Sequence, residues 1–90
     1  MKAYRLIAHG ENFSVAIDGD RRNMGFYLPV FVLAEDAAIA MELAREALVE
    51  RLDAKSAVST KASTVVFENV VEIDSREVPT TLPGFAWFAS

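Results

Sequence analysis

The fold is decided by one stretch of sequence, Ala34–Lys55, which reads AEDAAIAMELAREALVERLDAK. Its apolar residues recur at spacings of three and four, the period of one side of an α-helix. They are Ala37, Ala40, Met41, Ala44, Ala47, Leu48 and Leu52. Acidic side chains stand in its first turn, at Glu35 and Asp36, and basic ones stand near its last, at Arg51 and Lys55, which suits the helix dipole. The stretch predicts an amphipathic helix whose many alanines let it lie close against a sheet.

The residues before this helix have the alternating pattern of β-strands. Lys2–Ala8 alternates between two faces. After a polar interruption at His9–Asn12, Phe13–Ile17 alternates again, so it extends the same ribbon past a bulge. Asp18–Asn23 contains an Asp-Gly pair, which favours the positive φ angles of tight reversals. These segments predict a hairpin.

Strand signals also flank the helix on both sides. Gly25–Leu33 is rich in aromatic and β-branched residues. Its Pro29 requires a sheet edge or a bulge, because proline cannot donate a ladder hydrogen bond. Beyond the helix, Lys55–Ser63 lacks periodicity and is interpreted as a connection, whereas Thr64–Asp74 is predicted to be a long strand and Gly84–Phe88 a short final one.

The order strand, strand, helix, strand, strand predicts a single α+β domain over residues 1–90. We expect a four-stranded, mostly antiparallel sheet with one amphipathic helix packed on one face. Thr64–Asp74 carries apolar residues on both faces, with Val65, Phe67, Val71 and Ile73 assigned to one of them.

A single helix covers only one face of such a sheet, so the remaining apolar surface needs another cover. Large exposed apolar patches mark association surfaces, and two-fold dimers are the commonest oligomers. The sequence therefore predicts a homodimer formed sheet to sheet or by edge pairing. The interface candidates are Phe26, Phe31, Phe85, Trp87 and Phe88.

Composition excludes several classes of protein. The chain has no cysteine and one histidine, so it offers no disulfide, no thiolate site and no multi-histidine metal centre. Its four glycines are widely separated, so no phosphate-binding loop and no cofactor are predicted. A net charge of -4 argues against nucleic acid. The longest apolar run, Met24–Ala34, is too short to span a membrane, and a cytoplasmic protein is expected.

Two charged groups are candidates for docking a protein partner. Glu42, Glu46 and Glu50 follow one another at intervals of four, which forms an acidic stripe on the predicted helix. The stripe suits either a solvated face or a basic partner. Arg21 and Arg22 lie in the predicted hairpin turn, where polar side chains are ordinarily solvated.

Catalysis would depend on the single histidine. His9 with Ser14 and an acid such as Glu11 or Asp18 would make a nucleophile triad, but no nucleophile-elbow motif accompanies these residues. Polar residues at the end of a strand explain the same pattern. No catalytic or metal-binding residue is assigned.

Three segments carry a resemblance to known proteins. They are Gly10–Phe13 (GENF), Gly25–Tyr27 (GFY) and Gly84–Phe88 (GFAWF), with an Ala- and Glu-rich helix between the last two. In this layout the chain resembles a group of small bacterial proteins of unassigned function. The resemblance implies a small bacterial α+β protein and carries no catalytic residue.

The sequence favours a non-enzymatic, cytoplasmic, homodimeric protein-interaction module, of a size that suits an adaptor, immunity or antitoxin role. The alternative is a small-ligand-binding or regulatory domain with a pocket between helix and sheet or at the dimer seam, lined by Tyr27, Phe67 and Trp87. An enzyme would require His9 and Glu11 or Asp18 to converge in a cleft.

Overall fold

A long β-hairpin forms the centre of the fold in the computed structural model, which describes residues 1–90. Its strands are β1 (Lys2–Ile17) and β2 (Asp20–Ala34). The turn consists of Asp18 and Gly19, whose φ angles of 51° and 86° suit a two-residue hairpin loop. The predicted hairpin is confirmed, but Asp18–Asn23 is not all turn, because pairing with β1 resumes at Asp20.

The polar interruption in β1 is a β-bulge. The pairing of β1 with β2 changes register between Gly10 and Phe13, and Asn12 adopts a φ of 62°. Beside the bulge, position 10 requires glycine, since a side chain there would overlap the ring of Phe26 on the neighbouring strand. The strand therefore continues through His9–Asn12 as one curved ribbon.

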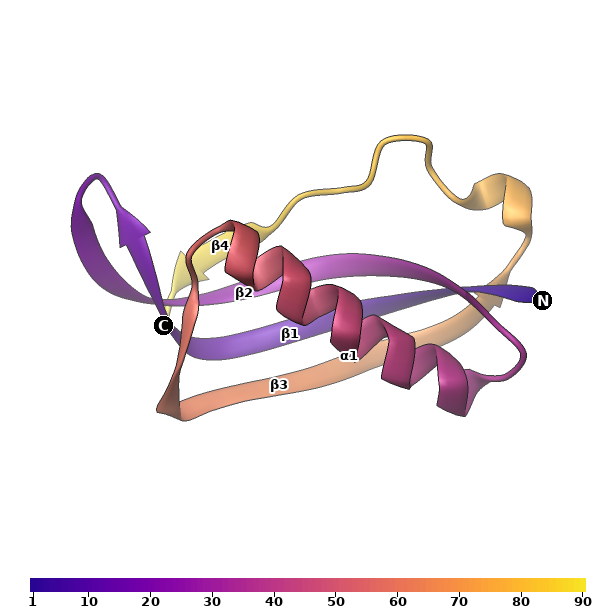
Figure 1. Cartoon of the computed structure of the whole chain (residues 1–90), viewed down its shortest axis with the longest axis horizontal. Coiled ribbons are helices and arrows are strands. Elements are labelled where there is room, and N and C mark those ends of the chain that lie inside the picture. The colour runs from indigo at the N-terminus through magenta and orange to yellow at the C-terminus, as the bar shows by residue number, and fades with distance from the viewer.

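The predicted helix is confirmed as α1 (Ala37–Ala54), which crosses one face of the sheet diagonally (Figure 1). Glu35 and Asp36 precede its first turn rather than lying within it. Asp36 is the N-cap, and its carboxylate accepts a hydrogen bond from the amide of Ile39 at 2.9 Å. The buried residues of the helix are Ala40, Ala44, Leu48 and Leu52.

β3 (Val58–Ile73) begins earlier than the sequence predicted. The interpretation of Lys55–Ser63 as a connection is wrong for all but its first three residues. Hydroxyl side chains make this possible, because Thr60 Oγ1 and Ser63 Oγ donate to the carbonyl of Asn12 at 3.0 and 2.6 Å. Polar side chains thus satisfy the backbone where the bulge of β1 breaks the regular ladder.

A second irregularity in β3 reverses its alternation. Asn69 has a φ of 54°, and the register with β1 shifts beside it. Phe67 consequently packs against the core, whereas Val71 pairs with Arg5 on the opposite face. The assignment of Val65, Phe67, Val71 and Ile73 to one face is therefore wrong.

The sheet has the order β3-β1-β2-β4, and all its pairs are antiparallel, which confirms the predicted fold class. β4 (Ala86–Ala89) pairs only with Met24–Tyr27 of β2. Pro29 therefore lies on a free edge, where its missing donor costs nothing. A short 3-10 helix, η1 (Ser75–Glu77), begins the segment that runs along this edge to β4 (Figure 1).

The core lies between α1 and one face of the sheet. It contains aromatic and aliphatic residues of the central hairpin and the small residues of the helix. Its largest fully buried side chains are Phe26, Leu6 and Leu28. Phe26 is enclosed by Phe13, Phe85 and Trp87, whose ring centroids lie 5.2 to 5.5 Å from its own.

An exposed ion pair orders the start of η1 and gives a testable titration. Arg76 donates to both carboxylate oxygens of Asp74, at 3.1 and 2.8 Å, and these bonds, followed by the backbone amide of Arg76, hold the pKa of Asp74 below its ordinary value. The stabilisation is present above the ordinary pKa and is lost as the pH falls through the lowered one. We expect Arg76→Gln to raise the Asp74 pKa in a carbon-13 NMR titration, whereas Arg22→Gln, on the distant hairpin, leaves it unchanged. If Arg76→Gln leaves the pKa of Asp74 unchanged, Arg76 is not the cause of the lowered pKa.

Candidate functional site

No helix or strand of the chain covers the face of the sheet opposite α1, here called the open face (Figure 1). The strand register places alternate residues of each strand on it. Its apolar residues are Ile7, Tyr27, Pro29, Phe31, Leu33, Val66, Val71, Ile73 and Phe88. Leu33 and Val66 are each 54% exposed, so the surface is both apolar and accessible.

Three aromatic rings form the middle of the open face. The rings of His9 and Tyr27 are stacked, with centroids 4.5 Å apart and planes 20° apart. Phe88 completes the group at 6.0 Å from His9 and 5.5 Å from Tyr27. The cross-strand pairs His9 with Tyr27 and Gly25 with Phe88 bring these rings together from β1, β2 and β4.

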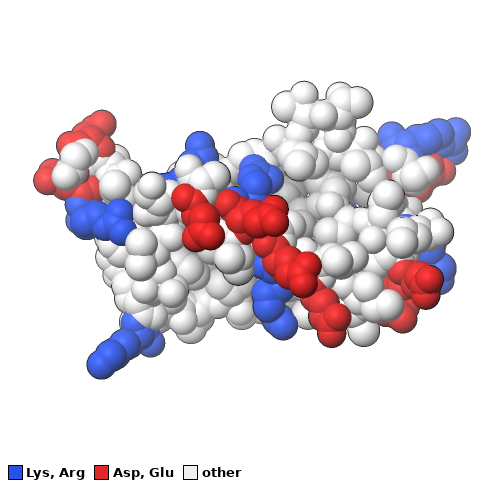
Figure 2. Space-filling view, viewed as in Figure 1, with Lys and Arg blue, Asp and Glu red and all other residues white.

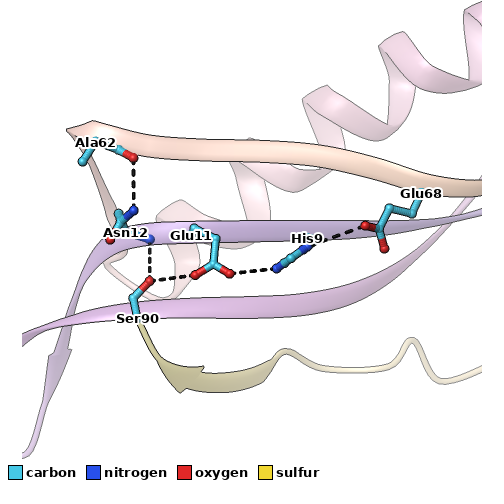
Figure 3. Close-up of polar contacts among 6 residues, drawn as sticks. All are labelled: His9, Glu11, Asn12, Ala62, Glu68 and Ser90. Atoms are coloured by element: carbon cyan, nitrogen blue, oxygen red, sulfur yellow. Dashed lines mark hydrogen bonds and ion pairs between the residues drawn. The ribbon is translucent and has the colours of Figure 1, made fainter.

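Two carboxylates hold the imidazole of His9 (Figure 3). Its Nε2 lies 2.9 Å from Oε2 of Glu11, and its Nδ1 lies 3.7 Å from Oε1 of Glu68. Ser90 Oγ donates to the other oxygen of Glu11 at 3.0 Å and accepts from the amide of Asn12 at 2.8 Å. This chain of contacts ties the C-terminus to β1 and fixes the plane of the histidine ring.

The hydrogen bonds that link Ser90, Glu11 and His9 do not follow the sequence of contacts in a nucleophile triad. A triad needs a serine hydroxyl bonded to the imidazole, whereas here the carboxylate of Glu11 stands between Ser90 and His9. Asp18 is in the hairpin turn and takes no part in the cluster. The geometry therefore brings His9 and Glu11 together without the hydrogen bond that activates a nucleophile.

The five aromatic interface candidates divide between two places. Phe31 and Phe88 lie on the open face. Phe26 is 0% exposed and belongs to the core, so its selection as an interface residue is wrong. Phe85 and Trp87 pack beside it, and their rings stack at 4.6 Å. Alternation within Ala86–Ala89 sends Trp87 and Phe88 to opposite faces.

The exposed aliphatic residues of the open face were not predicted from the sequence. Leu33, Val66 and Val71 are 40 to 54% exposed and surround the aromatic rings. Counting alternate positions from Asp18 and Gly19 along both arms of the hairpin would have assigned Leu33 to this face. For Val71 no local signal exists, because the bulge at Asn69 determines its side.

The docking candidates lie on other surfaces. Glu42, Glu46 and Glu50 are exposed on α1, where acidic side chains form a diagonal band (Figure 2). Arg21 and Arg22 are exposed on the hairpin, and Arg21 Nη1 donates to the carbonyl of Ser56 at 3.1 Å. That contact ties the hairpin to the end of α1.

A cavity of about 320 Å³ opens between the second half of α1 and β3, here called the α1–β3 cavity. Its apolar lining consists of Phe13, Leu48, Val49, Leu52, Ala57 and Val65, and its polar lining of Arg45, Asp53 and Ser59. None of Tyr27, Phe67 and Trp87, which were expected to line a pocket between helix and sheet or at the dimer seam, lines this cavity. Tyr27 lies on the open face, and Trp87 fills the core beside Phe26.

Comparisons with protein-family models, with curated proteins and with solved structures give no match for this chain. No helix is long and apolar enough to cross a membrane. The side chains form no group of three or more His, Cys, Asp or Glu residues that could hold a metal ion. The open face and the α1–β3 cavity are therefore the two candidate functional sites of the chain.

Proposed function

We propose that the protein is a small homodimeric interaction module whose open face binds the same face of a second copy. The observation that carries this proposal is an apolar sheet face with no cover from its own chain. A non-enzymatic adaptor, immunity or antitoxin role suits such a module. We propose the cytoplasm as its compartment, since a chain without cysteine gains nothing from an oxidising one.

The broad side of the molecule, on which the open face lies, is large enough to bind a second copy. The molecule measures 41 × 26 × 18 Å, so its broad face has a footprint on the order of 1,000 Å². A stable interface buries roughly 800 Å² on each partner. The rings of His9, Tyr27 and Phe88 at the middle of the face resemble the aromatic anchors that dominate binding energies.

The charges of the open face also suit a two-fold dimer. Arg5 lies on this face beside Phe31 and is exposed, and none of the four ion pairs of the chain includes it. Glu68, on the same face, presents a carboxylate that is 44% exposed. In a self-complementary interface each such contact occurs twice, so Arg5 of each copy meets an acid of the other.

The homodimer has a consequence for further partners. If two open faces pack together, both helices point outward. The acidic stripe formed by Glu42, Glu46 and Glu50 then stays exposed on each side, where it is available to a basic protein partner.

Light scattering over a wide concentration range tests the homodimer. We expect a mass of twice 9.9 kDa. Val66→Lys should weaken the dimer at least about 30-fold, because an unpaired charge buried at an interface costs about 2 kcal/mol or more. Val49→Lys is the matched control, since Val49 is also 54% exposed but lies on α1.

The two variants separate this proposal from its rivals. A wild-type monomer at all concentrations would refute the homodimer. Equal weakening by Val66→Lys and Val49→Lys would move the interface away from the open face. Far-UV circular dichroism of both variants confirms that each remains folded before its mass is interpreted.

A further inference from the structure

The α1–β3 cavity is an apolar trough with opposite charges along its rim. Its floor and walls are apolar, and its volume lies at the lower end of the range for small-molecule pockets. Arg45 and Asp53 both line it, and both belong to α1. They are eight residues apart, so about 12 Å of helix separates them at 1.5 Å per residue.

Neither residue belongs to an ion pair within the chain, since none of the four ion pairs includes Arg45 or Asp53. The guanidinium of Arg45 lies 5.9 Å from the ring centroid of Phe67, which holds it toward β3. Asp53 stands in the last turn of α1, where the helix dipole adds further negative charge and favours a bound cation.

We propose that the α1–β3 cavity binds a short apolar peptide of three residues with free termini. The peptide carboxylate pairs with Arg45, its ammonium pairs with Asp53, and an apolar side chain enters the trough over Leu48 and Leu52. An extended chain spans at most about 3.3 to 3.6 Å per residue, so a tripeptide has nearly the length of the stretch of α1 between Arg45 and Asp53.

The pairing of charges decides between ligand classes. The carboxylate of a fatty acid would pair with Arg45, but Asp53 would be left without a partner. The ammonium of an alkylamine would pair with Asp53, but Arg45 would be left without a partner. A ligand with separated opposite charges pairs with both residues at once. Guanidinium and carboxylate form the stronger, bidentate pair, which sets the direction of the peptide.

Isothermal titration calorimetry with the peptide Ala-Leu-Ala tests the site. We expect saturable binding of Ala-Leu-Ala and a large loss of affinity for Ala-Ser-Ala. Arg45→Gln should weaken Ala-Leu-Ala about two- to fivefold, as an exposed ion pair would, and so should Asp53→Asn. Both residues are exposed, so neither change disturbs the core.

Capped peptides assign each end of the ligand. With the C-terminal amide of Ala-Leu-Ala, Arg45→Gln should have no further effect, and with the N-acetylated peptide, Asp53→Asn should have none. Ser59→Phe places a ring beside Phe13, its partner on β1, and should abolish binding by filling the cavity.

Several outcomes would overturn this proposal. They are no binding of Ala-Leu-Ala at millimolar concentration, undiminished binding to Ser59→Phe, equal affinity for the doubly capped peptide, and tighter binding of octanoate or octylamine. The α1–β3 cavity lies on the helix side of the sheet, so each result is independent of whether the open face forms a dimer.

Discussion

Gly10→Ala is expected to destabilise the protein by about 3 kcal/mol, which is the upper end of the usual cost of overpacking a core. A Cβ atom at this position would overlap three carbons of the Phe26 ring. That ring cannot move aside, because it is 0% exposed and other aromatic rings surround it. For a domain of this size the loss lowers the melting temperature by roughly 12 °C or more.

Urea unfolding followed by circular dichroism measures this effect, and the chain offers a matched control. Gly84→Ala adds the same methyl group where nothing lies within 4 Å and the backbone is not left-handed. Its stability should stay within about 0.5 kcal/mol of the wild type. If the two variants unfold at the same urea concentration, the Phe26 ring does not pack directly against Gly10.

The contact between Gly10 and Phe26 illustrates what the sequence could not predict. The helix and the hairpin turn were predicted because their signals are local: a period of 3.6 residues in one case and an Asp-Gly pair in the other. The space that a side chain at position 10 would need is occupied by the Phe26 ring, which belongs to another strand. This contact exists only in the register that pairs Gly10 with Phe26.

Bulges explain most of the remaining differences between prediction and structure. Asn12 and Asn69 both adopt positive φ angles, and each shifts the register of the strand that contains it. Asparagine tolerates a positive φ better than most residues, but an asparagine in a strand sequence does not by itself predict a bulge. The sides of Val66 and Val71, and hence the composition of the open face, depend on the bulge at Asn69.

Among the candidate site residues, too, those set by a local pattern were predicted and those brought together from distant segments were not. The acidic stripe was predicted from spacing along one helix. The cluster of His9, Glu11 and Glu68 joins two strands, and Ser90 reaches it from the end of the chain. His9 and Glu11 are only two residues apart on β1, so strand alternation places them on one face. No local pattern relates either residue to Glu68 or Ser90, which come from distant parts of the chain.

Ala44→Glu is expected to prevent folding. Ala44 is 0% exposed at the centre of the buried side of α1, where the helix lies against the sheet. A carboxylate there would be desolvated without a partner, and its longer side chain would force the helix off the sheet. Buried unpaired charges and overpacking each cost several kcal/mol. A domain of this size has only roughly 5 to 13 kcal/mol of stability to lose.

Ala38→Glu makes the same substitution on the exposed side of the first turn of α1. A negative charge at this end of a helix is favourable, so this variant should keep or slightly raise the wild-type melting temperature. Far-UV circular dichroism should show a native spectrum for Ala38→Glu and an unfolded one for Ala44→Glu. A native, equally stable Ala44→Glu protein would mean that α1 packs on the sheet through another side. The α1–β3 cavity would then lose its wall, because Leu48 and Leu52 share the buried side with Ala44.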